Sequence, residues 1–342
     1  MKNIIEKLSD MRGVSGFEYR ITDKIANMFK PYCDEVKIDA LGSVIAHKKS
    51  NIKNAPKVMI EAHCDEIGLI VNNITDDGYI TFSNVGGVDN RILPSIEVVV
   101  HGREDIKGVI GIKPDFLLEK DKTVKIKDMA VDTGLDADSV KKLVSVGDSI
   151  TIAQSVGELG KKQWSGKSLD DRAGVAALID VLKNINNERI CADVYAVATV
   201  QEEVGCRGAK TSAFSINPDL AVAIDVTHAK TPDNSDCEFE TGSGVVISTG
   251  PNIHPQLYKR LVSICEDNKI KYDIEVEAGN TGTDAWEIQT ARDGIPTALL
   301  SIPLKYMHTS VETISVADVK AISKLLETLI KSIEEDVKWL SL

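Results

Sequence analysis

The sequence has few features of a membrane, secreted or nucleic-acid-binding protein. Its 342 residues contain no apolar run near the roughly 20 residues that a membrane-spanning helix needs. The first residues, MKNIIEKLSDMRG, carry charges throughout and lack the uncharged core and small-residue cleavage site of a signal peptide. These absences lead us to expect a cytoplasmic protein.

The cysteines and the basic residues also form no recognisable pattern along the chain. The six cysteines form no CxxC pair and no regular framework, so we expect reduced, mostly buried thiols. The net charge is −12, and no basic stripe is available to replace the counterions of phosphates. The sequence therefore predicts neither a nucleic-acid partner nor a membrane partner.

The chain does contain enough apolar sequence, 43% of its residues, for one or two hydrophobic cores. Strands alternate with helices in residues 1–70 and 164–342, which is typical of a layered α/β domain. Between them, residues 71–163 consist of short Val/Ile runs separated by glycine-rich turns, as in a small β module. We therefore expect a fold of class α/β in which the β-rich stretch is an insertion.

The expected elements follow from helical or continuous apolar patterns. The predicted strands cover residues 36–38, 43–47, 58–62, 193–200, 220–225, 272–277 and 296–302, and the predicted helices cover 4–11, 21–29, 136–147, 172–185 and 256–268. A last helix is predicted from about Val316 to Trp339, with Ser315 and Asp318 as its capping box.

Carboxylate and imidazole side chains gather near the ends of these predicted strands and at the start of one helix. The set comprises His63, Asp65, Asp170, Glu202, Glu203, Asp225 and His308. Because the carboxyl ends of strands form the ligand-binding edge of an open α/β sheet, we expect these side chains to converge there.

Two imidazoles with several carboxylates suit a borderline divalent ion such as zinc, and cobalt and manganese tolerate the same ligands. Two such ions can share one carboxylate at a separation of roughly 3.5–4 Å. A carboxylate beside a ligand, as Glu202 is beside Glu203, can take the proton of an attacking water. His63 and Asp65 are two residues apart, so Asp65 can orient the imidazole while Cys64 faces the core.

Each of these motifs also has a simpler interpretation when it is taken alone. Asp170 and Asp171 can cap the helix at 172–185, and Glu202 with Glu203 can form a solvated loop. The polar segment 280–284 can line a pocket or form an ordinary turn, and His228 poses the same choice. Only the joint pattern at one sheet edge favours a metal centre.

Five segments resemble the M42 metallopeptidases, the tetrahedral, self-compartmentalising aminopeptidases, some of which are named glutamyl aminopeptidase or endoglucanase. The segments are EAHCDEIG (61–68), SLDDRAG (168–174), TVQEEVGCRGA (199–209), AIDVTHA (223–229) and GTDAWEIQTARDGIPTALLSIPLKYMHTSVE (282–312). They occur in the family's order over nearly the whole chain. Two departures are Cys64, where an apolar residue is usual, and GIKPDFL (111–117) in the insertion.

The resemblance implies a role for each matching position. The implied ligands are His63 and Asp225 for one metal ion, Glu203 and His308 for the other, and Asp170 as the bridge. It further implies that Glu202 is the general base and that Asp65 orients His63. The two divalent ions are expected to be zinc or cobalt, with manganese possible.

The resemblance also implies a fold and an assembly. The expected fold is a zinc-peptidase-like α/β sandwich, residues 1–70 and 164–342, with an inserted small β-barrel, PDZ-like, at 71–163 that mediates dimerisation or oligomerisation. The expected assembly is a homo-oligomer, a dodecamer built from dimers.

The implied activity is removal of the N-terminal residue from short peptides by a metal-bridged water that Glu202 activates. Three alternatives stay open from the residues alone. They are an amidase or carboxypeptidase on the same scaffold, a glycosidase with two carboxylates and no metal, and a non-catalytic protein with a closed structural metal site.

Overall fold

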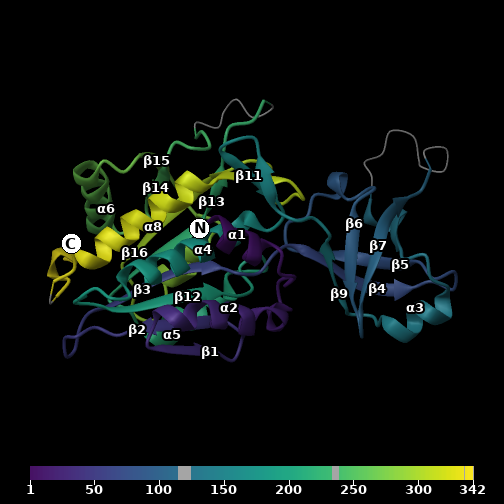
Figure 1. Cartoon of the computed structure of the whole chain (residues 1–342), viewed down its shortest axis with the longest axis horizontal. Coiled ribbons are helices and arrows are strands. Elements are labelled where there is room, and N and C mark those ends of the chain that lie inside the picture. Colours follow the sequence, from purple (N-terminus) through teal and green to yellow (C-terminus); the bar gives the residue numbers. More distant parts are fainter. Residues whose placement is uncertain (115–124, 233–238, 335, 342) are drawn as a thin grey trace.

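The computed structural model describes residues 1–114, 125–232, 239–334 and 336–341. The chain forms two lobes along its longest axis, a large α/β body and a smaller β-barrel at one end (Figure 1). This arrangement confirms the expected α/β class with an inserted barrel.

An eight-stranded sheet forms the centre of the large lobe. Its strand order is β1 (Glu35–Ile38), β2 (Val44–Lys48), β12 (Asp193–Thr199), β3 (Lys57–His63), β13 (Leu220–His228), β16 (Thr297–Leu304), β14 (Val245–Thr249) and β15 (Tyr272–Val276). The four central strands β12, β3, β13 and β16 are parallel, so their carboxyl ends meet at one edge. Their nearly continuous apolar sequences fit strands that are buried on both faces.

Helices cover both faces of this sheet. One hydrophobic core lies between the sheet and α1 (Lys2–Ser9), α2 (Thr22–Phe29), α4 (Leu169–Ile185), α6 (Pro255–Asn268) and α8 (Val316–Lys331). A second core lies under α5 (Arg207–Ile216) and α7 (Asp284–Gln289). The large lobe is therefore the predicted α/β sandwich.

The last helix differs from its prediction. α8 ends at Lys331, and a short 3₁₀ turn at Lys338–Leu340 follows, so the prediction of one helix to Trp339 is wrong. Ser315 does cap α8 by accepting a hydrogen bond from the backbone N–H of Ala317. Asp318 does not complete a capping box, because its carboxylate accepts bonds from Gly242 and Gly244 at the start of β14.

The small lobe is a closed six-stranded barrel with its own apolar core. Its strands are β4 (Gly68–Ile74), β5 (Ile80–Val85), β6 (Glu97–His101), β7 (Asp105–Ile112), β8 (Met129–Asp132) and β9 (Ser149–Ile152). α3 (Ala137–Leu143) packs on the barrel and is shorter than the predicted helix at 136–147. The barrel strands thus run from residue 68 to 152, compared with the insertion predicted at 71–163.

The segment after the barrel belongs to the large lobe. β10 (Gly157–Leu159) and β11 (Gln163–Gly166) form a separate three-stranded sheet with β17 (Glu312–Ser315). This sheet links the chain that enters α4 to the chain that enters α8. Two segments that carry expected site residues, around Asp170 and His308, are thereby held close together.

Five of the six cysteines lie in the described ranges and all five are free. Cys64 and Cys265 are buried, whereas Cys33, Cys191 and Cys206 are only half-buried, so the thiols are less buried than expected. Cys237 and residues 115–117 of the unusual insertion segment lie outside the described residues.

None of the helices in the described ranges is both long and apolar enough to span a membrane.

Candidate active site

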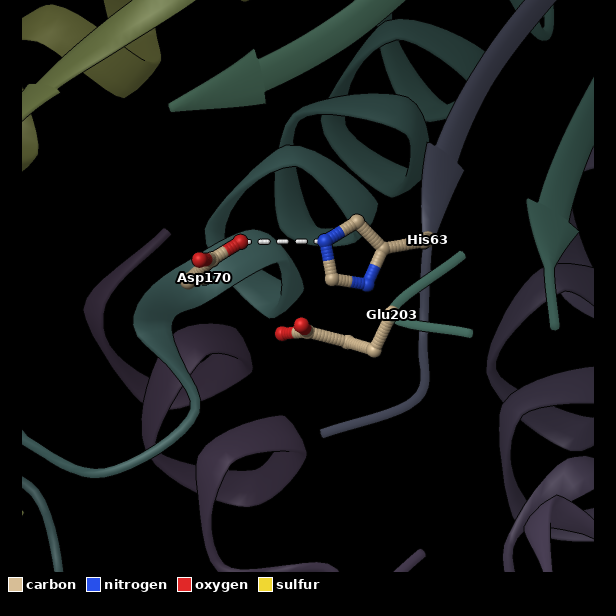
Figure 2. A group of neighbouring side chains, drawn as sticks. All are labelled: His63, Asp170 and Glu203. Carbon is tan, nitrogen blue, oxygen red and sulfur yellow. Dashed lines mark hydrogen bonds and ion pairs between the residues drawn. The ribbon is translucent and has the colours of Figure 1, made fainter. Parts of the chain in front are cut away.

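The predicted site residues converge at the carboxyl edge of the central strands. His63 is the last residue of β3, Asp225 lies on β13, and Glu202 and Glu203 follow β12. A pocket of about 620 Å³ opens at this edge, and Asp170, Glu202, Glu203, Asp225 and His308 all contribute to its lining. His63 lies beside Asp170, with its ring turned toward that carboxylate (Figure 2).

Asp170 lies between the two histidines. Its Oδ1 is 3.0 Å from His63 Nε2, and its Oδ2 is 3.3 Å from His308 Nε2. Glu203 Oε1 also lies 3.3 Å from His308 Nε2. One carboxylate that presents a different oxygen to each of two imidazoles has the arrangement that a bridging metal ligand requires.

Asp171 has a different surrounding from Asp170, its neighbour. Its Oδ1 accepts a hydrogen bond of 3.0 Å from the backbone N–H of Gly174 in the first turn of α4. Both residues have non-helical backbone angles, so the regular helix begins at Arg172, as predicted. The sequence leaves two interpretations of the pair open, a helix cap or part of the site. In the structure Asp171 caps the helix, whereas Asp170 faces the site.

Asp65 connects His63 to the two glutamates. Its Oδ1 lies 3.6 Å from His63 Nδ1, and its carboxylate accepts bonds of 3.2 Å from the backbone N–H groups of Glu202 and Glu203. Asp65 thus fixes the turn after β12, and its carboxylate lies beside the imidazole of His63 without a hydrogen bond to it. Cys64 points away into the main core, as the strand alternation predicted.

Glu312 is a site residue to which the sequence analysis gave no role. One of its oxygens accepts backbone N–H bonds of 2.7 Å from Leu169 and 3.2 Å from Asp170, and the other accepts a 3.0 Å bond from the N–H of His308. It therefore holds the Asp170 and His308 segments together. No periodicity signals this role, although Glu312 ends the segment MHTSVE that carries the family resemblance.

A buried ion cluster supports the chain that leads to Asp170, and the sequence analysis also missed it. Glu66 accepts from Lys167 Nζ at 2.6 Å and from Arg172 Nη2 at 3.1 Å. All three side chains are almost completely buried. Burial raises the pKa of Glu66, but the charges of Lys167 and Arg172 outweigh it and hold that pKa at about 2.

The barrel lobe reaches the site through the loop after β5. The backbone carbonyl of Gly87 lies 3.0 Å from His308 Nδ1, so it fixes the ring that presents Nε2 to Asp170. A side chain at position 87 would place its Cβ 2.7 Å from that nitrogen. Glycine is therefore needed for this close approach.

The site has an excess of negative charge. Burial, together with the neighbouring carboxylates, raises the pKa of Asp225 well above its usual value, and burial raises the pKa of Glu202 to about 10. The pKa of His308 rises to about 11, because Asp170 and Glu203 outweigh the effect of burial on the imidazole. No lysine or arginine is among the described residues that line the pocket.

This donor set fits divalent metal ions. Ligand atoms of His63, Asp170 and Glu203 lie within 4.8 Å of one another, and His308 and Asp225 border the same space. Imidazole nitrogen with carboxylate oxygen is the ligand chemistry of zinc and cobalt. The buried excess of carboxylates is a charge that one or two such ions would balance.

Glu202 belongs to a second group at the pocket wall. Its Oε1 lies 3.4 Å from Cys206 Sγ, and Asp284 lies within reach of both. Thr199 Oγ1 donates to Asp284 at 2.6 Å and so fixes that carboxylate at the start of α7. Glu202 is thus half-buried beside the implied ligands, and it is not hydrogen-bonded to His63 or His308.

The remaining pocket wall comes from β13, β15 and the loop before α7. Residues Asn280 to Thr283 and His228 line the pocket. Of the two interpretations that the sequence left open for them, the structure therefore supports a pocket wall. The wall also contains Thr227, Glu275, Glu277, Trp286, Glu287 and Leu299.

Known proteins resemble this chain over nearly its whole length. The sequence profile described as M42 glutamyl aminopeptidase matches residues 42–325. A lysyl aminopeptidase of Pyrococcus furiosus is 37% identical, with 97% of each chain covered.

Solved structures share the fold as well. An aminopeptidase of Desulfurococcus kamchatkensis superposes with a TM-score of 0.92 at 36% identity, covering 99% of this chain and 96% of its own. The TET1 peptidase of Pyrococcus horikoshii, which can assemble into a tetrahedron or a large octahedral shell, gives 0.86 at 34% identity, with coverage of 97% and 99%.

Proposed function

Because this chain belongs to the M42 glutamyl aminopeptidase family, and is therefore a peptidase, we propose that it removes the N-terminal residue of short peptides at a two-metal centre. The observation that carries the proposal is the position of Asp170, one of whose oxygens lies beside His63 and the other beside His308. A closed structural metal site would not need the open pocket of about 620 Å³ beside these ligands.

The proposed ligands divide between two ions. His63 and Asp225 would hold one ion, Glu203 and His308 would hold the other, and Asp170 would contribute a ligand to both. Zinc or cobalt suits these ligands best, and manganese is tolerated. When bound, the ions would supply Lewis-acid polarisation of the scissile carbonyl and lower the pKa of water.

Glu202 is the proposed general base. It lies at the pocket wall beside the ligands, where it can take a proton from the attacking water and give it to the leaving amine. Asp65 accepts hydrogen bonds from the backbone N–H groups of Glu202 and Glu203. It therefore keeps the proposed base and the neighbouring ligand close to His63.

The charge of the pocket favours a substrate with a free amino terminus. Carboxylates of Glu202, Glu203 and Asp225 line the pocket without a compensating lysine or arginine among the described lining residues. A protonated amino terminus is attracted to such a wall, whereas an acylated one carries no charge. We therefore propose an aminopeptidase in preference to a deacylase or a carboxypeptidase.

The test is hydrolysis of free-amino p-nitroanilides and their N-acetylated counterparts, after chelation and after adding zinc, cobalt or manganese back. We expect metal-restored cleavage of the free-amino compounds only. Cleavage of the acetylated compounds alone would instead identify a deacylase. Activity on glycosides that a chelator does not affect would identify a glycosidase.

We further propose that the chain works in the cytoplasm as a homo-oligomer, a dodecamer built from dimers through the barrel insertion at 71–163. The support is that the similar TET1 peptidase assembles into tetrahedral or octahedral shells. The barrel lobe also exposes large apolar side chains, including Val146 at 67%, Val109 at 47% and Tyr79 at 45%. Such side chains suit an interface between subunits better than open solvent.

A further inference from the structure

Two carboxylates of the pocket have no part in the proposed chemistry. Glu275 lies on β15, the edge strand of the sheet, and Glu277 follows the last residue of that strand. The backbone N–H of Glu277 still donates to the carbonyl of Thr249 at 2.8 Å, and both glutamates line the pocket. The part of the pocket wall that they form can therefore contact a group of the substrate other than the scissile bond.

Glu275 is held at a defined distance from the proposed metal centre. Thr227 Oγ1 donates a 2.6 Å hydrogen bond to Glu275 Oε1. Thr227 follows Asp225 by two positions on β13, so it lies on the same face and about 6.6 Å further along the strand. The pocket wall therefore leads from a proposed ligand, through a threonine, to a fixed carboxylate.

Glu275 and Glu277 lack a cationic partner. Among the residues that the structure describes, neither has a lysine, arginine or histidine nitrogen within 4.0 Å. Glu287, a third glutamate of the wall, differs because Lys210 Nζ lies 2.7 Å from its carboxylate. Burial raises the pKa of Glu275, and burial followed by the charge of Glu275 raises the pKa of Glu277. A cation brought by the substrate would relieve this repulsion.

The pocket also has apolar side chains in its wall. Trp286, Leu299 and Met307 contribute to its lining. A long side chain with an apolar stem and a charged end can pack its stem on such residues while its charge reaches a carboxylate.

We propose, resting on the two-metal aminopeptidase function, that this pocket selects a lysine or arginine as the first residue of the peptide, with Glu275 and Glu277 as its specificity-determining residues. The four-carbon stem of lysine would extend along this wall, with its ammonium group toward Glu275. An acidic first residue would meet only like charges there and is rejected.

The experiment compares kcat/KM of the metal-restored enzyme for the p-nitroanilides of lysine and norleucine, which have nearly the same length and differ in the terminal charge. We expect the lysine compound to be preferred by about 10- to 100-fold, as one desolvated charge-assisted hydrogen bond allows. The arginine compound should behave like lysine, and the glutamate compound should be the poorest substrate.

Variants assign the preference to its residues. E275Q should lower the lysine-to-norleucine ratio by about tenfold, mainly through KM for lysine, and the double variant E275Q/E277Q should abolish it. The exposed glutamate on α1 supplies the matched control, E6Q, which should keep the ratio of the unaltered enzyme.

The outcomes separate this inference from the function on which it rests. Cleavage of free-amino substrates with glutamate or norleucine preferred over lysine would overturn the inference and leave the aminopeptidase function intact. An unchanged lysine preference in E275Q/E277Q would also overturn it. Failure of every free-amino substrate, with metal bound, would instead contradict the proposed function.

Discussion

Asp170 and Asp171 are neighbours of the same residue type, yet their surroundings give them opposite properties. Hydrogen bonds from His308 and His63 outweigh burial and lower the pKa of Asp170, whereas burial and the charge of Asp225 raise the pKa of Asp171. The residue pattern alone could place both residues before a helix but could not say which one faces the site, and only the family resemblance implied that it is Asp170. That distinction depends on the backbone turn at the start of α4.

The substitution E202Q tests the proposed base. It keeps the shape of the side chain but removes its capacity to accept a proton, so kcat should fall by about 10²- to 10⁴-fold while the metal content stays the same. Steady-state kinetics with metal analysis on one preparation checks both quantities. Turnover near that of the unaltered enzyme would remove Glu202 from the mechanism.

The substitution E312Q tests a positioning residue. Glu312 uses both oxygens to accept backbone N–H bonds from the Asp170 and His308 segments, and glutamine can supply only one acceptor oxygen. We expect metal affinity to fall by about 10- to 100-fold, as for other residues that orient ligands. Competition with a chromogenic chelator measures this affinity, and E6Q again serves as the control. Unaltered affinity in E312Q would show that the ligands hold their positions without it.

Glu66 should make stability depend on acid pH. Its folded-state pKa of about 2 lies below the ordinary 4.5, so the folded protein binds this proton more weakly than the unfolded chain does. Its ionisation therefore stabilises the fold above about pH 4.5 by about 3 kcal/mol, and this contribution is lost as pH falls toward 2. As pH falls from about 4.5 toward 2, the free energy of unfolding of the original protein should therefore decrease toward that of E66Q. A difference that stays constant with pH would contradict the assignment.

At the scale of elements, the central strands were predictable because they are apolar runs of suitable length, and β3, β12, β13 and β16 all occur where expected. The predictions missed α5, α7 and β14. α5 follows a left-handed residue, Cys206, without a capping side chain, and α7 has only six residues. The apolar spacing beyond Lys331 suggested a longer α8, yet Leu340 reaches the same core from a separate turn.

The contact between α5 and β12 should control the position of the two glutamates. A Cβ at Gly208 would lie 2.5 Å from the backbone N and O of Val200, just before Glu202. We expect G208A to lower the free energy of unfolding by about 1–3 kcal/mol and to reduce kcat. Urea unfolding and kinetics check this prediction. G157A is the matched control, because nothing lies within 4 Å of its added Cβ. Equal stability of the two variants would contradict the account.

At the scale of the whole molecule, the change of texture along the sequence predicted a small β-rich insertion, and the family resemblance implied that this insertion is a barrel. The sequence could not predict that the barrel lobe touches the site, because the Gly87–His308 contact joins residues 221 positions apart. Nor could it predict Glu312, whose partners lie 143 and 4 positions away. Each candidate ligand could be identified from its own sequence motif. The residues that position these ligands act through tertiary contacts, which the sequence does not show.

The proposed assembly gives a prediction at the same scale. Light scattering during size-exclusion chromatography should give a mass twelve times that of one chain. V146E, which places a charge on the most exposed large apolar side chain among the described residues of the barrel lobe, should shift the protein to smaller species if that face is buried between subunits. A monomer in the unaltered protein would contradict the dodecamer.

The most direct test of the two-metal centre is to titrate the chelated protein with cobalt while following cleavage of a free-amino p-nitroanilide and the number of bound ions. We predict that activity reaches its plateau at two ions per chain and that D170N, which removes a shared carboxylate between His63 and His308, reaches neither the plateau nor this stoichiometry. Full activity in chelator, or two bound ions in D170N at the same cobalt concentration, would contradict it.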